Sequence, residues 1–306
     1  MSDDSPMTNT PTRAGFVAVV GAPNVGKSTL INRLVGTKVS IVSPKVQTTR
    51  TRVLGICMAG AAQVIFVDTP GIFLPRRRLD RAMVAAAWGG AQDADRVLVL
   101  VDAKRGACED TAAIIAKLKE AGRTATLAIN KVDLVRKEAL LALAAELASH
   151  DIFTDTFMIS AEKGDGTDDL LEHIAGSLPQ SPWLFPEDQV SDMPERLLAA
   201  EITREQLYHQ LHQELPYAAT VETESWEDKP DGSVRIEQVI FVERDSQKAI
   251  VLGKRGSRIK ELGSTARAEL ESILECKVHL FLFVKVRDNW GDDPERYRDW
   301  GLDFNA

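Results

Sequence analysis

The chain has few cysteines and no long apolar run. Its three cysteines, Cys57, Cys108 and Cys276, are odd in number and widely separated, which excludes a disulfide framework and the spacing of a zinc site. No stretch approaches the roughly 20 apolar residues that a membrane-spanning helix needs. The opening segment MSDDSPMTNTPTR is acidic and polar, whereas a signal peptide has a basic start and an apolar middle. We therefore expect a cytoplasmic protein with reduced thiols.

The chain also lacks an excess of positive charge. Its formal net charge of -8 excludes a protein that coats nucleic acid with its whole surface, although a local basic site is compatible with that charge. A content of 44% apolar and 27% charged residues is typical of a soluble globular protein. With 306 residues, the chain is long enough for two domains.

Apolar, β-rich runs alternate with helical patterns over residues 14–178. The runs FVAVV, QVIFVDT, RVLVLVDA, TATLAINK and TFMIS are each separated by enough chain for a crossover helix. Continuous apolar strands are typical of a parallel sheet that is covered on both faces. The sequence therefore predicts an α/β domain with a mostly parallel sheet at 14–178, preceded by a disordered tail at 1–13.

A second domain is predicted at 195–306, after a linker at 179–194 that contains four prolines. A helix is expected to open near Glu195, because Leu207, Leu211 and Leu215 recur at helical spacing. The later elements are expected as strands around 218–224 and 234–242, a strand at AIVLG, a helix from about 264 to 274, and a strand at KVHLFLFVKV. This pattern predicts an α+β domain.

The stretch GAPNVGKS lies between an apolar run and the start of an amphipathic helix, as a phosphate-binding loop does. Its backbone N–H groups would surround a β-phosphate at a helix N-terminus, and Gly21 and Gly26 would let the backbone approach closely. Lys27 would bridge the β- and γ-phosphates, and the Ser28 hydroxyl would bind Mg²⁺. The candidate loop comprises Gly21, Ala22, Pro23, Asn24, Val25, Gly26, Lys27, Ser28 and Thr29.

Three shorter motifs follow at the ends of later strands. In DTPG, which is Asp68, Thr69, Pro70 and Gly71, the aspartate would hold Mg²⁺ through water and the Gly71 N–H would meet the γ-phosphate.

In NKVD, the Asp133 carboxylate would accept hydrogen bonds from N1–H and the 2-amino group of guanine, which adenine cannot offer. Asn130 would tie this loop to the phosphate loop, and the Lys131 stem would lie over the base. The Ala161 N–H, after Ser160, would reach guanine O6.

In the order and spacing of these motifs the sequence resembles the translation-factor-related GTPases of the TrmE-Era-EngA type. The stretch QTTR is similar to the Era group, in which a threonine completes the Mg²⁺ shell. That threonine would be Thr49, with Thr48 as the alternative. Ile72 follows DTPG where Ras-type enzymes have a water-orienting glutamine, so we expect slow intrinsic hydrolysis and assign no general base. The run RRRLDR at 76–81 is interpreted as a solvated helix start rather than an RNA contact.

A second candidate site contains the motif GxxG, from Gly253 to Gly256. Its surroundings resemble a KH domain, whose GxxG loop clamps about four single-stranded nucleotides. Lys254 and Arg255 would face phosphates, and Ile250 and Leu252 would line the groove beside the loop. The candidate RNA-binding residues are Gly253, Lys254, Arg255, Gly256, Arg258, Ile259 and Lys260.

A GTPase domain followed by a KH domain is the organisation of the Era family. This resemblance implies GTP/GDP and Mg²⁺ as ligands, binding near the 3′ end of small-subunit (16S) ribosomal RNA, and a role in rRNA processing and small (30S) subunit assembly. It also implies a position at the inner face of the cell membrane, for which nothing in the composition argues. We expect a monomer. The alternative function is a checkpoint or scaffold GTPase that uses the KH fold to dock a protein or membrane partner. His209 and His212 are interpreted as a solvated helix face rather than a metal site.

Overall fold

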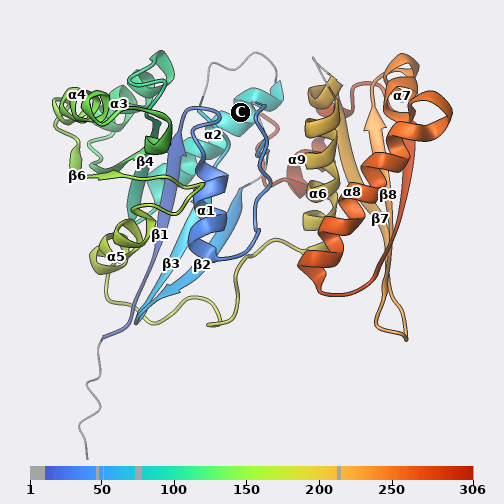
Figure 1. Ribbon diagram of the computed structural model, residues 1–306, viewed down its shortest axis with the longest axis horizontal. Coiled ribbons are helices and arrows are strands. Elements are labelled where there is room, and N and C mark those ends of the chain that lie inside the picture. The colour runs from blue at the N-terminus through green and yellow to red at the C-terminus, as the bar shows by residue number, and fades with distance from the viewer. Residues whose placement is uncertain (1–10, 46–47, 51, 73–77, 212–214, 306) are drawn as a thin grey trace, which may run out of the picture.

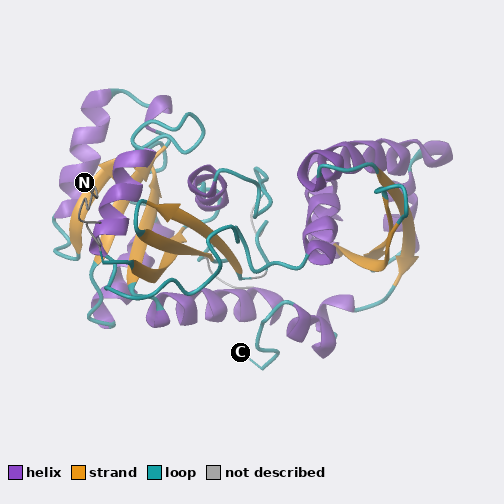
Figure 2. Ribbon diagram, turned by 90° about the horizontal axis from the view of Figure 1, so that it is seen from below, coloured by secondary structure: helices purple, strands orange, loops and turns teal. Residues whose placement is uncertain are grey.

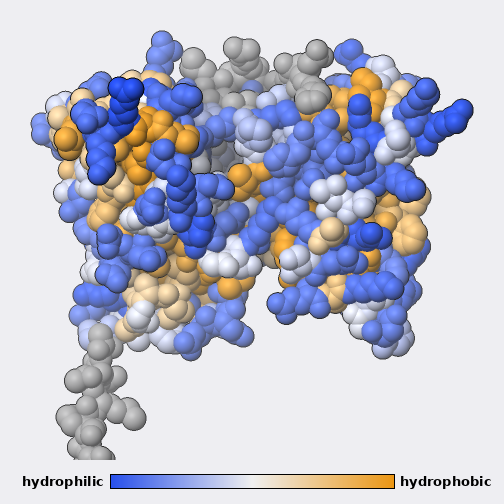
Figure 3. Space-filling model, in the orientation of Figure 1, coloured by the Kyte–Doolittle hydropathy of each residue, from blue (hydrophilic) through white to orange (hydrophobic). Residues whose placement is uncertain are grey.

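Two separate β-sheets, each covered by helices, organise the chain (Figure 1). The computed structural model describes residues 11–45, 48–50, 52–72, 78–211 and 215–305. The expected tail at 1–13 lies mostly outside these residues, and Arg13 is already the first residue of a strand. Within the described ranges, no helix has the length and hydrophobicity needed to cross a bilayer. The face shown in Figure 3 is mostly hydrophilic, with smaller apolar areas between the polar ones.

The first sheet has six strands in the order β2-β3-β1-β4-β5-β6. They are β1 (Arg13–Gly21), β2 (Val53–Ala59), β3 (Ala62–Asp68), β4 (Arg96–Asp102), β5 (Ala125–Asn130) and β6 (Phe153–Met158). All neighbours are parallel except β2 and β3, so the predicted mostly parallel sheet is confirmed. The sequence reasoning did not predict β2, which forms a hairpin with β3.

Helices cover both faces of this sheet (Figure 2). They are α1 (Lys27–Val35), α2 (Arg78–Asp93), α3 (Glu109–Glu120), α4 (Lys137–Ala148) and α5 (Thr167–Ser177). Alternate β1 residues enter different cores: Val19 packs with side chains of α1 and α5, whereas Val20 packs with side chains of α2, α3 and α4. Burial on both faces explains why the strands have continuous apolar sequences.

Residues 179–194 run along the first sheet. The Ile56 N–H donates to the Val190 carbonyl at 2.9 Å, and the Leu54 N–H donates to Asp192 Oδ1 at 3.0 Å. Gln63 Nε2 donates to the Phe185 carbonyl at 2.8 Å. The proline-rich segment is therefore attached to the β2–β3 hairpin before the chain enters the second domain.

The second sheet has the order β7-β8-β9, with β7 antiparallel and β9 parallel to β8. Its domain contains α6 (Glu195–Gln210), β7 (Ala219–Asp228), β8 (Val234–Val242), α7 (Asp245–Leu252), α8 (Ser257–Leu274), β9 (Val278–Val286) and α9 (Pro294–Asp299). Apolar side chains of α6 and α8 pack with those of the sheet, as in Leu207, Leu262 and Ile240. This is the predicted α+β domain.

Three predictions for this domain were wrong in detail. In the stretch AIVLG, the residues AIVL end α7 and the glycine is its C-cap, so no strand forms there. Gln247 Oε1 accepts the N–H groups of Glu243 and Arg244 and caps the start of this helix. Helix α8 begins at Ser257, directly after the GxxG motif, rather than near residue 264 as expected. Helix α6 ends at Gln210, so Leu211 is its cap and Leu215 lies in a short 3₁₀ turn.

Candidate functional site

The phosphate-loop motif connects β1 to α1 at the carboxyl edge of the parallel sheet. Its glycines are required by their surroundings: a Cβ at Gly21 would come within 2.6 Å of the Leu100 carbonyl oxygen. At Gly26, φ is +99° and a Cβ would lie 2.5 Å from Asn130 Nδ2. The loop can therefore lie against β4 and β5 only with glycine at these positions.

Lys27 lies across the loop that precedes it. Its Nζ donates to the carbonyls of Gly21 at 3.1 Å and Ala22 at 3.3 Å. Burial lowers the pKa of Lys27 to about 8, and the negative charge of Asp68 opposes this shift. A phosphate at the loop would supply the buried ammonium with a further anionic partner.

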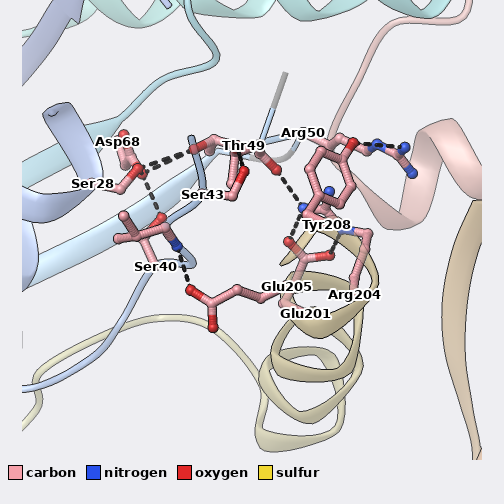
Figure 4. A network of polar contacts seen from close by, with 12 residues as sticks. Ser28, Ser40, Ser43, Thr49, Arg50, Asp68, Glu201, Arg204, Glu205 and Tyr208 are labelled. Carbon is pink, nitrogen blue, oxygen red and sulfur yellow. Dashed lines mark hydrogen bonds and ion pairs between the residues drawn. The ribbon is translucent and has the colours of Figure 1, made fainter. Parts of the chain in front are cut away.

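Hydroxyl groups converge on the carboxylate of Asp68 at the end of β3 (Figure 4). Asp68 Oδ2 accepts hydrogen bonds from Ser28 Oγ at 2.8 Å and from Ser40 Oγ at 2.5 Å. Thr49 Oγ1 lies 3.1 Å from Ser28 Oγ and 3.4 Å from Asp68 Oδ2. Thr48 does not join this group, because its Oγ1 lies 2.6 Å from Ser43 Oγ.

The second carboxylate oxygen of Asp68, Oδ1, shows whether these hydroxyl and carboxylate groups could bind a cation. Asp68 Oδ1 is buried and has no hydrogen-bond partner among the described residues. Burial raises the pKa of Asp68, while the hydroxyls of Ser40 and Ser28 and the charge of Lys27 lower it. Carboxylate and hydroxyl oxygens are ligands that Mg²⁺ prefers. The residues present therefore fit a magnesium site.

Gly71 and Ile72 lie beside the phosphate loop. A Cβ at Gly71 would be 3.1 Å from Pro23, so this backbone directly contacts the loop. The Ile72 N–H donates to the Gly21 carbonyl at 3.3 Å, and the Ile72 side chain is buried in the core with Ala18. An apolar side chain in that position cannot orient a water molecule.

Asn130 joins the phosphate loop to the segment that begins at Ser160. Its Nδ2 donates to the Val25 carbonyl at 2.8 Å, and its Oδ1 accepts the Ala161 N–H at 2.9 Å. Asp133 is exposed beside this segment. A hydrogen bond from the Ser160 side chain is the main reason that the pKa of Asp133 is lowered. The carboxylate therefore stays ionised, and it forms an ion pair of 3.4 Å with Lys163.

Sequence reasoning missed two residues that hold this end of the site. Arg33 of α1 donates from Nε to the Ala161 carbonyl at 3.3 Å and from Nη2 to the Glu162 carbonyl. Asp102, at the end of β4, forms an ion pair of 2.8 Å with Lys131, whose Nζ also donates to the Asn24 carbonyl. Asp102 could have been identified from the sequence, because it ends a predicted parallel strand at the sheet edge where ligands bind. Nothing in the sequence distinguishes Arg33 from other helix residues.

These motifs enclose a cavity of about 360 Å³. The described residues that line it come from the phosphate loop, from residues 41–44 and 48–49, and from the DTPG and NKVD motifs. They are Pro23, Asn24, Gly26, Lys27, Ser28, Thr29, Ile41, Val42, Ser43, Pro44, Thr48, Thr49, Gly71 and Lys131.

The GxxG loop lies between α7 and α8 in the second domain, and α7 is on the side away from the first domain (Figure 1). Gly253, Arg255 and Gly256 have φ values of +71°, +53° and +75°. The side chains of Lys254 and Arg255 are exposed. Beside the loop, Ile250 is exposed, whereas Leu252 and Ile259 are half-buried against the core.

The basic run at 76–81 and the two histidines near the end of α6 are weaker candidates for an RNA or metal site. Helix α2 begins at Arg78, whose guanidinium carbon lies 4.4 Å from the centroid of the Phe304 ring, while Arg76 and Arg77 lie outside the described residues. His209 is exposed on α6, and His212 also lies outside the described residues. In the part of the chain that the structure describes, no group of three or more His, Cys, Asp or Glu residues could hold a metal ion.

Comparison with known proteins connects these features. The family model of 50S ribosome-binding GTPases matches residues 16–131, and the KH domain model matches residues 214–291. GTPase Era of Rhizobium meliloti is 63% identical over 296 residues, which cover 96% of this chain and 94% of that protein. The chain belongs to the GTPase Era family. It is a GTPase with a C-terminal KH domain.

Further Era proteins are similar over nearly their whole length. GTPase Era of Mesorhizobium japonicum is 60% identical over 99% of this chain and 98% of that protein. A crystal structure of an Aquifex aeolicus Era variant bound to GDP·AlF4⁻ superposes with a TM-score of 0.90 at 41% identity, covering 95% of this chain and 99% of that chain. A second Era structure has the same TM-score, identity and coverage, and contains MgGDPNP and nucleotides 1506–1542 of 16S ribosomal RNA.

Proposed function

We propose that this Era-family GTPase binds Mg²⁺ and GTP in the cavity of the first domain and single-stranded RNA from the 3′ end of the small-subunit ribosomal RNA at the GxxG loop. In this way it would assist rRNA processing and assembly of the small subunit. The observation that carries the proposal is the convergence of Ser28, Thr49 and Asp68 in one cavity, in a chain that also has an exposed basic GxxG loop. The solved Era complex with MgGDPNP and 16S RNA supports the same pair of ligands.

Each part of the cavity has its own task in this proposal. The loop from Gly21 to Thr29 and the Lys27 ammonium bind the phosphates, Ser28 and Thr49 hold Mg²⁺ directly, and Asp68 holds it through water. The bound ion neutralises charge that develops between the β- and γ-phosphates. The Gly71 N–H contacts the γ-phosphate, so that Gly71 and Thr49 respond to its presence.

The base and the attacking water are handled differently. Asp133 and the Ala161 N–H select guanine, while Asn130 and Lys131 keep the base loops against the phosphate loop. Ile72 places no polar group near the attacking water, so intrinsic hydrolysis is slow. A position at the inner face of the membrane is implied by family resemblance alone and stays a prediction, as does the monomeric state.

The RNA part of the proposal is tested by reversing the charge of the loop. The Lys254→Asp/Arg255→Asp variant should lose crosslinking to a single-stranded RNA with the small-subunit 3′-end sequence, while its GTP hydrolysis in the absence of RNA stays unchanged. Arg136→Asp/Lys137→Asp makes the same charge change at the exposed start of α4 and is the matched control. If the loop variant retains RNA crosslinking, or the control loses it equally, the GxxG assignment is wrong.

A further inference from the structure

Helix α6 is polar in sequence but buried. All residues from Ala199 to Tyr208 are buried, including Glu201, Arg204 and Glu205. The side chains of Ala200 and Leu207 pack in the core of the second domain. The charged side chains point the other way, toward a segment of the first domain that comprises residues 38–45 and 48–50 (Figure 4). Buried charges are costly unless they are paired, so this face of α6 requires the partners that it has.

Two charged side chains of α6 bind the backbone of that segment, one at Val42 and the other at Thr48. Glu205 Oε1 accepts the Val42 N–H at 2.7 Å. Arg204 Nη2 donates to the Thr48 carbonyl at 2.5 Å, and its Nε donates to Glu201 Oε1 at 2.7 Å. The segment is therefore bound through its main chain, at the residue directly before Thr49 and at the residue two positions after Ser40.

Apolar and cationic anchors fix the rest of the segment. The Ile41 side chain is buried in the core of the second domain with Ala199 and Ile202. Lys38 forms ion pairs with Glu205 and Glu269, and Arg50 donates to the Ala219 carbonyl at 3.1 Å. The segment that carries Thr49 is thus attached to the second domain at both of its ends.

We propose that Arg204 and Glu205 are positioning residues for GTP hydrolysis, because they set the backbone from which the Thr49 hydroxyl reaches the magnesium site. This inference rests on the proposed role of Thr49 in the cavity. It extends the nucleotide site to residues of α6, which packs on the second sheet and lies outside the cavity. A displacement of about 1 Å in a group of this kind can change a catalytic rate by about 10²-fold.

The test uses variants of α6 that keep the fold. Glu201→Met/Arg204→Met removes the bond to the Thr48 carbonyl without leaving an unpaired buried charge, and such replacements are often neutral for stability. Glu205→Ala removes the acceptor for the Val42 N–H, whereas Glu205→Gln keeps an oxygen there and is the conservative rescue. Arg196→Met is the matched control, because Arg196 lies on the same helix and, among the described residues, its side chain donates only to the Thr223 and Glu224 carbonyls.

Amide hydrogen exchange of the nucleotide-free protein measures the attachment itself. Glu205→Ala should speed exchange at Val42 about fivefold or more, as expected for loss of one buried hydrogen bond, and Glu205→Gln should not. In single-turnover assays, Glu205→Ala and the double Met variant should lower the hydrolysis rate about tenfold or more and raise the Mg²⁺ concentration for half-maximal rate. The affinity of these variants for GDP without Mg²⁺ should stay unchanged. Arg196→Met should match the unmodified protein in exchange at Val42, hydrolysis rate and Mg²⁺ requirement.

Two outcomes overturn the inference. If exchange at Val42 rises while the rate and the Mg²⁺ requirement stay the same, the attachment is real but does not position Thr49. If exchange does not change in any α6 variant, the attachment is absent in solution. Failure of the unmodified protein to bind guanine nucleotides would instead refute the proposed function, and the exchange data would still stand because they need no nucleotide.

Discussion

Arg33 links parts of the proposed nucleotide site that are far apart in the sequence. Its guanidinium, on the helix that follows the phosphate loop, donates to the carbonyls of Ala161 and Glu162. We expect Arg33→Ala to weaken GDP binding about tenfold, since two charge-assisted hydrogen bonds that hold the base loop are lost. Titration with a fluorescent GDP analogue measures this, with Arg136→Ala as an exposed control. Equal affinities for the two variants would show that the base loop keeps its position without Arg33.

Asp133 is the residue proposed to select guanine. The ionised carboxylate of Asp133 accepts hydrogen bonds through both oxygens, and Asp133→Asn replaces one acceptor oxygen by a donor. The variant should lose affinity for GTP and gain affinity for xanthosine triphosphate, which carries an oxygen in place of the 2-amino group. Competition binding with both nucleotides measures the preference. If the variant still selects GTP, Asp133 does not read the base.

The residues differ in how far sequence alone could identify them. Lys27, Asp68 and Asp133 stand in short motifs whose chemistry is local, so their places at the strand ends could be inferred. Arg33 and Arg204 act through carbonyl groups more than 100 residues away in sequence, and their partners depend on the fold. A single sequence does not contain that pairing.

Among the elements, the strands of the first sheet other than β2 were predictable, whereas β2 and α7 were not. Continuous apolar runs such as β3 have no other stable place than a sheet covered on both faces. The four apolar residues of AIVL fit a strand or a helix equally well, and a cap formed by Gln247 decides for the helix. The β2 strand escaped prediction because its sequence, VLGICMA, contains a glycine and follows a polar segment.

The two glycines of the GxxG loop are not equivalent, so substitutions at them should affect stability differently. At Gly253, φ is +71° and a Cβ would lie 2.7 Å from the Arg258 Cβ; at Gly256, φ is +75° and no atom lies within 4 Å. Gly253→Ala should therefore lower the free energy of unfolding by roughly 1–3 kcal/mol, whereas Gly256→Asn should change it by less than about 1 kcal/mol. Urea denaturation of the full chain measures both. If both variants lower the free energy of unfolding equally, the structure accommodates a Cβ at Gly253 without destabilisation.

At the scale of the whole molecule, both domains share the segment that lines the nucleotide cavity. If RNA and GTP favour the same arrangement of the domains, each must strengthen binding of the other by one common factor. We expect this factor to be about 5- to 150-fold for a non-hydrolysable GTP analogue compared with GDP. RNA affinity measured with each nucleotide, and nucleotide affinity measured with and without RNA, give the factor independently. Unequal factors, or a factor of one, would exclude coupling at equilibrium.

The position of Ile41 also constrains how such a protein can evolve. This residue leaves the first domain and completes the hydrophobic core of the second, among Ala199, Ile202 and Leu270. In a chimaera that joins the first domain of one homologue to the second domain of another, the residue at position 41 would pack in a core to which its size and shape are not matched. Substitutions at position 41 should therefore covary with those at positions 199 and 202 among homologues. The two domains would then evolve together.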